Sequence, residues 1–587
     1  MRNAYNRGGP QAGGKARATV EILDNGFQHL FRENANETEV IAKYHGDIGQ
    51  IARDLQAEVE ILSPGYAIVT IDRDRIVNLY SYLQIEHLEL PKSLYIAAPS
   101  NLASSCIPTV QNRGGYNLSG AGVIVAIIDS GIDYTHPDFR NADGTTRILY
   151  IWDQSGEGTP PAGFAAGAEY TQEQINEALR SPNPLDVINF MDTNGHGTAV
   201  AGIAAGNGRG SNGQNMGIAT ESSLIIVKVG IRGYQAFSRT TELMRAIKYV
   251  IDRARERHMP VVINMSFGMN NGSHRGDSLF ETYLTTMSDE WKTSIVIPTG
   301  NEGAAGHHYR GRIAPNQVQE INYFTAPGIE EYYISFWKNF SDSFAVEILF
   351  PTGESSGIIS ISDQVRNVRV GNLVLTVIYG QPSHYSINQE IFFQVRATIG
   401  TIAPGTWRMR IISGRVVDGN FRMWLPTTEQ VTTETYFSNP VAEDTLTIPS
   451  TADKMITVAG YNDRVGNIAE FSGRGNSNMA LPSPDLAAPA VGILTTRVGG
   501  GYDAFTGTSM AAPFVTGSVA LMMQWGIIEN NDPFLYGERV RAFLRLGASR
   551  QANVVYPNPT SGYGTLCLNN TMTFLEQYKW GISNIWL

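Results

Sequence analysis

Three polar residues lie beside strongly apolar runs of the sequence, and their types could act together in catalysis. Asp129 follows the run VAII, His196 lies between two glycines in NGHGTAVAG, and Ser509 lies in FTGTSMAAP. A carboxylate that ends a buried strand needs hydrogen-bond partners, because desolvating it alone is costly. Taken singly, each of the three residues is better explained as a helix cap or a structural group.

Taken together, the three residues supply the parts of a nucleophilic site. An acid can orient an imidazole, the imidazole can accept a proton, and a hydroxyl at a helix N-terminus can then attack a carbonyl carbon. A serine hydroxyl is a weak nucleophile at its own pKa, so it requires such a base. The chain order is acid, histidine and serine, which is the order found in subtilisin.

The motifs around these residues carry a family resemblance. The runs IIDSGIDYTHPDF, NGHGTAVAGIAAG and GTSMAAPFVTG resemble the Asp, His and Ser signatures of the subtilases, the serine proteases of family S8. The resemblance implies a serine endopeptidase with Asp129, His196 and Ser509 as its triad. Asn301, in a Gly-Asn-Glu-Gly context, matches the family's oxyanion asparagine, with the Ser509 backbone amide as the second donor.

A fourth run, NMSFG, resembles the substrate-binding strand of the same family. Its residues Ser266, Phe267 and Gly268, together with Gly300, are expected to bind an extended peptide along a strand edge. Gly268 is expected to leave room for the side chain before the scissile bond. The residues before Gly300 are Pro and Thr, which depart from the small residues common in the family and leave the specificity pocket open.

No cofactor is required for this chemistry, but the resemblance also implies a structural calcium. Asp138 matches a position that ligates calcium in many subtilases, and the loop NGRGSNGQN at residues 207–215 offers oxygen atoms. That loop contains no carboxylate. The alternative is a solvated Asp138 beside a flexible loop.

The elements that must position these residues are predicted to form an α/β fold. Buried β-branched strands such as GVIVAIID, SLIIVKVG, PVVINMSFG, TSIVIPTG and MITVAGY alternate with helices such as TTELMRAIKYVIDRARERH. This pattern predicts a subtilisin-like doubly wound, mostly parallel sheet. The helix TQEQINEALRS should begin with a capping box of Thr171 and Gln174.

Two further regions differ in pattern from this α/β domain. Residues 19–96 are predicted to form a small α/β propeptide-like domain. Residues 313–441 are predicted to form an inserted all-β sandwich or jelly roll of short alternating strands. The predicted organisation is a disordered N-terminus at 1–18, the propeptide-like domain at 19–96, the subtilase domain at 97–312 and 442–587, and the insertion at 313–441.

Composition limits the partners of the chain. Its 587 residues include 55 acidic and 44 basic ones, which gives a net charge of -11 and argues against nucleic acid as a partner. No apolar run is long enough to span a membrane, and the polar N-terminus predicts no signal peptide and synthesis in the cytoplasm. Cys106 and Cys567 are predicted to be reduced, with one disulfide as the alternative.

The domain order is similar to that of the clostridial Csp-type subtilases, which act in spore germination. This resemblance implies a spore-associated protease that cuts a cortex-lytic zymogen and its own propeptide. Whether the propeptide is released or retained after cleavage is left open by the sequence. The processing bond is expected between Leu94 and Cys106 in an extended segment, and an uncleaved regulatory domain is the alternative. The competing hypotheses for the whole chain are a sensor or scaffold with idle catalysis, and a carbohydrate-binding protein.

Overall fold

The computed structural model describes most of the chain as two compact units, residues 1–96 and 97–587. The described residues are 37–63, 65–72, 75–79, 81–89, 100–113, 115–230, 239–382, 386–478 and 483–585. The predicted disorder of residues 1–18 lies outside these ranges.

The N-terminal unit is a four-stranded antiparallel sheet with the order β2-β3-β1-β4. Its apolar face packs on helix α1, which Asp47 caps by accepting a hydrogen bond from the Gln50 backbone N–H. The strand β1 is central to this sheet, and α2 is a single helical turn. The elements are β1 (Glu37–Tyr44), α1 (Ile48–Leu55), β2 (Glu58–Ser63), β3 (Tyr66–Asp72), α2 (Ile76–Leu79) and β4 (Ile85–Glu89).

The larger unit is built on a nine-stranded sheet with the order β22-β21-β10-β9-β5-β8-β6-β7, with β23 beside β21. The central pairs are parallel, as predicted, and only β7 and β22 run antiparallel at the ends. The strands are β5 (Ile124–Asp129), β6 (Ile148–Asp153), β7 (Ala168–Thr171), β8 (Ser223–Lys228), β9 (Val261–Met265), β10 (Thr293–Pro298), β21 (Ile456–Asn462), β22 (Asn467–Ile468) and β23 (Leu486–Pro489).

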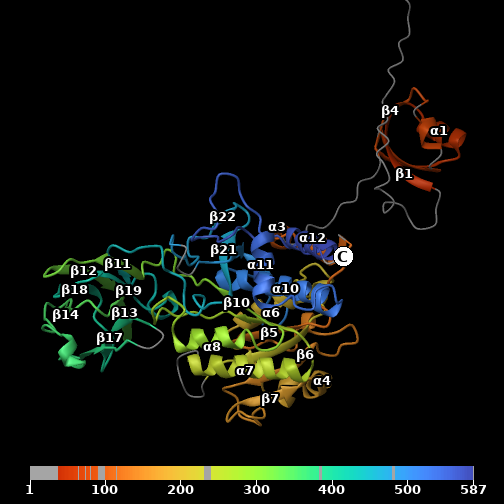
Figure 1. Cartoon of the computed structure of the whole chain (residues 1–587). Coiled ribbons are helices and arrows are strands. Elements are labelled where there is room, and N and C mark those ends of the chain that lie inside the picture. Colours follow the sequence, from red (N-terminus) through yellow and green to blue (C-terminus); the bar gives the residue numbers. More distant parts are fainter. Residues whose placement is uncertain are drawn as a thin grey trace, which may run out of the picture. The chain divides into compact units, whose positions relative to one another are not determined.

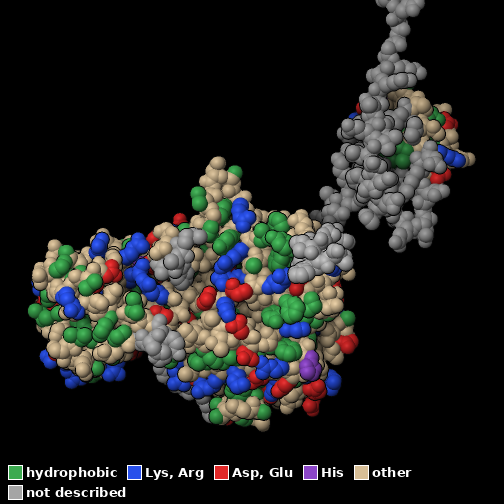
Figure 2. Space-filling view, in the orientation of Figure 1, with side chains coloured by type: hydrophobic (Ala, Val, Ile, Leu, Met, Phe, Trp, Pro, Cys, Tyr) green, Lys and Arg blue, Asp and Glu red, His purple; other side chains and the backbone are tan. Residues whose placement is uncertain are grey.

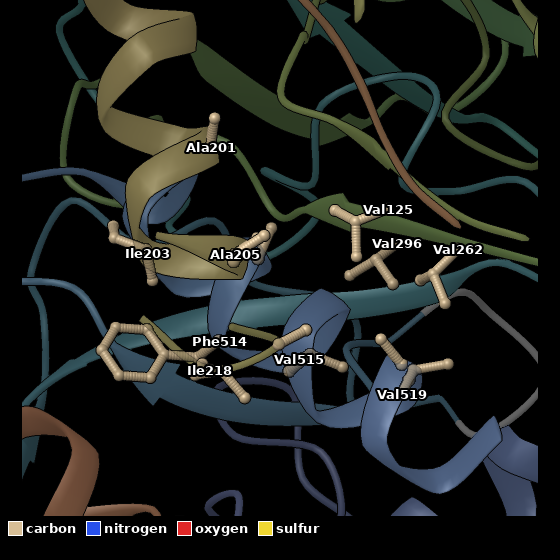
Figure 3. Packing of buried hydrophobic residues seen from close by; sticks show 14 of the residues in the cluster. Val125, Ala201, Ile203, Ala205, Ile218, Val262, Val296, Phe514, Val515 and Val519 are labelled. Atoms are coloured by element: carbon tan, nitrogen blue, oxygen red, sulfur yellow. The ribbon is translucent and has the colours of Figure 1, made fainter. Parts of the chain in front are cut away.

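Helices cover both faces of this sheet (Figure 1). Alternate residues of β5 face opposite cores: Val125 packs with α6 and α10, whereas Ala126 packs with α7 and α8. Figure 3 shows side chains of α6 and α10 meeting those of β5, β9 and β10. The helices are α4 (Gln172–Arg180), α5 (Pro184–Val187), α6 (His196–Ala205), α7 (Thr240–Glu256), α8 (Leu279–Met287), α10 (Thr508–Met523), α11 (Gly537–Gly547) and α12 (Leu568–Ile585).

Local signals in the sequence account for two of these helices. The capping box of α4 is present as predicted, with Thr171 and Gln174 bonded reciprocally. Helix α10 starts at Thr508 with Gly507 as its N-cap, so Ser509 is the second helical residue and not the cap. Pro513 lies beyond the first turn, inside α10.

Helix α10 together with the following turn, Thr508–Ile528, is long and apolar enough to cross a membrane by length and composition. In the structure 89% of that window is buried inside the protein. This degree of burial is typical of the central helix of a folded core.

The insertion consists of two antiparallel sheets that share one hydrophobic core. One sheet has the order β11-β19-β13-β17-β16-β15 and the other β14-β18-β12-β20. Its first strand begins at His308, a few residues before the predicted start at residue 313. The apolar run GIISIS leads into a short 3-10 turn, Ile361–Asp363. The elements are β11 (His308–Arg312), β12 (Val318–Thr325), β13 (Glu331–Asn339), β14 (Phe344–Leu349), β15 (Val365–Val370), β16 (Leu373–Tyr379), β17 (Asn388–Ala397), β18 (Gly405–Ser413), β19 (Asn420–Trp424), α9 (Thr428–Val431) and β20 (Tyr436–Phe437).

The two cysteines form a disulfide, so the expectation of reduced thiols was wrong. Cys106 and Cys567 are 461 positions apart in the sequence, yet their Cα atoms lie 4.9 Å apart. The Leu568 backbone N–H also donates to the Ser105 carbonyl, which joins the segment after α3 (Ser100–Ser104) to the start of α12. Sequence spacing alone gives no sign of this proximity, because it depends on the packing of α12.

The face of the molecule in Figure 2 carries basic and acidic side chains interspersed with polar ones. This distribution is typical of a protein surface without a large field of one sign.

Candidate active site

Asp129 and His196 are brought together by the end of β5 and the start of α6. The imidazole Nδ1 lies 2.7 Å from Asp129 Oδ1, which also accepts a hydrogen bond from the Ser130 backbone N–H at 2.7 Å. The aspartate side chain is 1% exposed and the histidine side chain 31% exposed. The acid is therefore buried behind a ring that reaches the surface.

Electrostatics favour the protonated form of His196. Burial by itself lowers the pKa of the ring, but the charge of Asp129 and its hydrogen bond outweigh this effect. Weaker contributions come from the charges of Asp192 and Glu429, and the net pKa of His196 is raised. The neutral ring of His196 is therefore a stronger base than a free imidazole.

Asp192 is a buried residue of this site that the sequence analysis missed. Its Oδ1 accepts hydrogen bonds from the Ser130 hydroxyl at 2.8 Å and from the Gly195 backbone N–H at 2.8 Å. Its Oδ2 accepts from the backbone N–H and the hydroxyl of Thr198. Asp192 thus fixes the first turn of α6, which carries His196, to the residue after Asp129. The available signal was an acid four residues before the histidine in MDTNGHG.

Ser509 and Asn301 are linked through Thr508. The backbone N–H and the hydroxyl of Thr508 both donate to Asn301 Oδ1 at 3.0 Å. Both bonds go to the amide oxygen. The amide nitrogen, Asn301 Nδ2, has no hydrogen bond to any residue that the structure describes. Ser509 is half-buried and its backbone N–H belongs to the first turn of α10, where helical partners are missing.

Gly507 faces the space between these two donors. An added Cβ on Gly507 would lie 3.7 Å from Asn301 Nδ2 and 3.9 Å from the Ser509 backbone nitrogen. The glycine has φ of 150°, which side-chain-bearing residues rarely adopt. The side-chain amide of Asn301 and the Ser509 backbone N–H thus both lie beside a position where no side chain is present.

The predicted substrate-binding residues follow β9 and β10. Ser266 Oγ accepts a hydrogen bond from Asn264 at 2.9 Å, and Phe267 packs at the edge of the core under α7. The Thr447 side chain fills the space beside both glycines of this strand edge. An added Cβ on Gly268 would lie 2.7 Å from the Cβ of Thr447, and one on Gly300 would lie 3.0 Å from the same atom.

The residues around Asp138 do not fit a calcium ion. Its carboxylate is fully buried and accepts hydrogen bonds from the Tyr502 hydroxyl to both oxygens at 2.9 Å and from the Gly210 backbone N–H at 2.7 Å. The carboxylate is held by hydrogen-bond donors, whereas a calcium ion needs about six to eight oxygen ligands around it. Within the described part of the chain, no group of three or more His, Cys, Asp or Glu side chains is arranged to hold a metal.

Comparisons with known proteins agree with this geometry. The model of the subtilase family matches residues 120–378 and 418–564, and that of the Csp protease B prodomain matches residues 15–92. The solved CspB protease of Clostridium perfringens is 38% identical, with a TM-score of 0.75 over 82% of this chain and 98% of that one.

Curated relatives include the PI-type proteinase of Lactococcus lactis subsp. cremoris, 23% identical over 78% of this chain and 25% of the relative. The intracellular serine protease of Paenibacillus polymyxa is 38% identical over 18% of this chain and 32% of the relative. This chain therefore spans only a quarter to a third of the length of these relatives. The family match covers most of the chain and both halves of the site, and the chain belongs to the subtilase family.

Proposed function

We propose that this protein is a serine endopeptidase that cuts peptide bonds with Asp129, His196 and Ser509. The observation that carries the proposal is the 2.7 Å contact between His196 Nδ1 and Asp129 Oδ1. An ionised carboxylate only accepts hydrogen bonds, so Nδ1 carries the proton and Nε2 keeps a lone pair. That lone pair can take the proton of a serine hydroxyl.

The reaction follows from these roles. Ser509 Oγ attacks the peptide carbonyl carbon while its proton passes to His196 Nε2, and the carbonyl oxygen becomes an oxyanion. Asn301 Nδ2 and the Ser509 backbone N–H donate to that oxyanion. His196 then gives its proton to the leaving amine, and water hydrolyses the acyl-enzyme by the same path. Asp129 holds the ring and stabilises its charged form throughout.

The proposed substrates are the protein's own N-terminal domain and a protein zymogen of the spore cortex-lytic type. The match of residues 15–92 to the Csp protease B prodomain supports the first substrate, and the similarity to CspB supports the second and a spore-associated location. The proposed processing bond lies between Leu94 and Cys106. Residues 100–104 of this segment form α3 and so are not extended as expected, whereas residues 94–99 lie outside the described ranges.

We also propose that the insertion is a jelly roll. Two antiparallel sheets around one core support this assignment, as does its position between the oxyanion loop and the Ser509 helix.

One experiment tests catalysis and processing together. Purified wild-type protein and its Ser509→Ala variant are compared by N-terminal sequencing and by labelling with a fluorophosphonate probe. We expect a new N-terminus near residue 100 and a labelled band in the wild type only, and size-exclusion chromatography reports whether the released domain stays bound. Equal, absent labelling of both proteins would refute the proposal and favour a scaffold with idle catalysis.

A further inference from the structure

One short segment of the insertion returns to the oxyanion loop. Between β19 and β20 the chain forms α9, and the backbone N–H of its first residue, Thr428, donates to Glu302 Oε1 at 2.9 Å. Glu302 directly follows Asn301 in the sequence. The segment that carries α9 is therefore bonded to the neighbour of the residue that we assign to the oxyanion.

A buried pair strengthens this attachment. His307 Nδ1 lies 2.5 Å from Glu302 Oε2, and both side chains are only 1% exposed. The other ring nitrogen of His307, Nε2, lies 3.3 Å from the carbonyl oxygen of Thr432, just after α9. His307 therefore contacts both the oxyanion loop and the residue that follows α9. Both ends of α9 are thus fixed against the oxyanion loop.

Helix α9 carries an unpaired acid. Glu429 is exposed, and in the part of the chain that the structure describes its carboxylate has no hydrogen bond or ion pair. Its charge reaches the catalytic ring, because Glu429 contributes to the raised pKa of His196 after Asp129 and Asp192. The other two acids are buried, with 1% and 2% exposure. Of these three acids, Glu429 is the one that an incoming substrate can contact.

We propose that Glu429 is a specificity-determining residue that binds a lysine or arginine side chain of the substrate close to the scissile bond. The inference rests on the proposed protease function and adds a substrate preference to it. The insertion then acts in recognition, because it carries this acid on a helix that is bonded to the residue after Asn301. A basic substrate side chain supplies the missing partner of Glu429, and opposite charges attract.

The test uses fluorogenic peptides of one core sequence that carry Lys, Ala or Glu at each of three positions on either side of the cut bond. They are hydrolysed by the full-length protein and by its Glu429→Gln and Glu429→Lys variants. Glu434→Gln is the matched control, since Glu434 is exposed on the same segment and is not among the charges that contribute most to the pKa of His196. Fluorophosphonate labelling counts active sites in every preparation.

We expect the wild type to prefer Lys to Ala at one or more positions. The Lys to Ala ratio of kcat/KM should fall by about two- to fivefold in Glu429→Gln, which is the range of a single exposed ion pair. Glu429→Lys should prefer Glu instead, Glu434→Gln should keep the wild-type ratio, and 1 M salt should weaken the preference. A labelled wild type whose ratio is unchanged by Glu429→Gln at every position overturns this inference alone, whereas an unlabelled wild type overturns the protease proposal.

Discussion

Thr508 holds the side-chain oxygen of Asn301 with two hydrogen bonds, both 3.0 Å long, from its backbone N–H and its hydroxyl. The residue before the proposed nucleophile thereby orients the proposed oxyanion donor. Thr508 is fully buried, so no water competes for these bonds. The serine and the asparagine are distant in the sequence, and this contact makes their relative position a property of α10.

Removing the Thr508 hydroxyl should therefore slow the chemical step. Thr508→Val keeps the volume and the backbone bond but loses one neutral hydrogen bond, and we expect kcat to fall about two- to tenfold. Asn301→Ala, which removes the donor itself, should lower kcat by about 100- to 1,000-fold. Steady-state kinetics with a peptide substrate measures both effects, and Thr508→Ser is the control that retains the hydroxyl. Wild-type kcat in Thr508→Val would contradict the orienting role.

The raised pKa of His196 predicts the acid limb of the pH profile. Only the neutral ring accepts a proton, so kcat/KM should fall as pH decreases through a value above the ordinary 6.5. Asp129→Asn removes the largest cause of the rise, so the limb should move to lower pH while activity drops by about four orders of magnitude. A pH series of kcat/KM for both proteins measures this, and an unmoved limb would contradict the assigned cause.

The same shift has a consequence for stability. A raised folded-state pKa means that the folded protein binds this proton more tightly than the unfolded chain does. The contribution to the free energy of unfolding is therefore complete below the unfolded pKa and is lost as pH rises through the folded value.

Much of the proposed catalytic centre could be assigned from the sequence because its signals are local. Asp129 ends a strand of uninterrupted apolar residues, His196 lies between glycines, and Ser509 begins an apolar helix. Their types and order indicate the chemistry before any distance is known. The assignment of Asn301 came from family resemblance, and the structure adds the bonds that orient it.

Other features depend on packing and leave no local pattern. The capping by Asp192 requires the loop before α6 to fold back on Ser130, and the link from Thr428 to Glu302 requires the insertion to return to its own starting point. The strand β1 has charged residues at both ends and is specified by pairing with β3 and β4 on either side. The hydrogen-bond donors to the Asp138 carboxylate, Tyr502 and Gly210, are also distant from it in the sequence.

The disulfide should contribute substantially to stability. Joining Cys106 to Cys567 restricts a very long loop of the unfolded chain, and removing such a link typically costs about 2–5 kcal/mol. Cys567→Ser should lower the free energy of unfolding by this amount, measured by denaturant titration. The double variant with Cys106→Ser should lose no more than the single one, because both remove the same bond. An equal stability of oxidised and reduced wild type would contradict this prediction.

Thr447 should determine how tightly the substrate strand fits. Its side chain occupies the space beside both Gly268 and Gly300, and an alanine at either position would approach the Cβ of Thr447 to 3.0 Å or less. Gly268→Ala should therefore displace the strand after β9 and lower kcat/KM, because a small misplacement of bound substrate strongly slows the reaction. Gly300 is a less clean site for the test, since its φ of 85° makes any side chain strained.

A second change distinguishes this clash from a general loss of folding. Thr447→Gly removes the atoms that an alanine at position 268 would meet, so the double variant with Gly268→Ala should recover much of the lost kcat/KM. Melting temperatures of all variants show whether the protein stays folded. If the double variant is no more active than Gly268→Ala alone while both remain folded, contact with Thr447 is not the reason that glycine is needed at position 268.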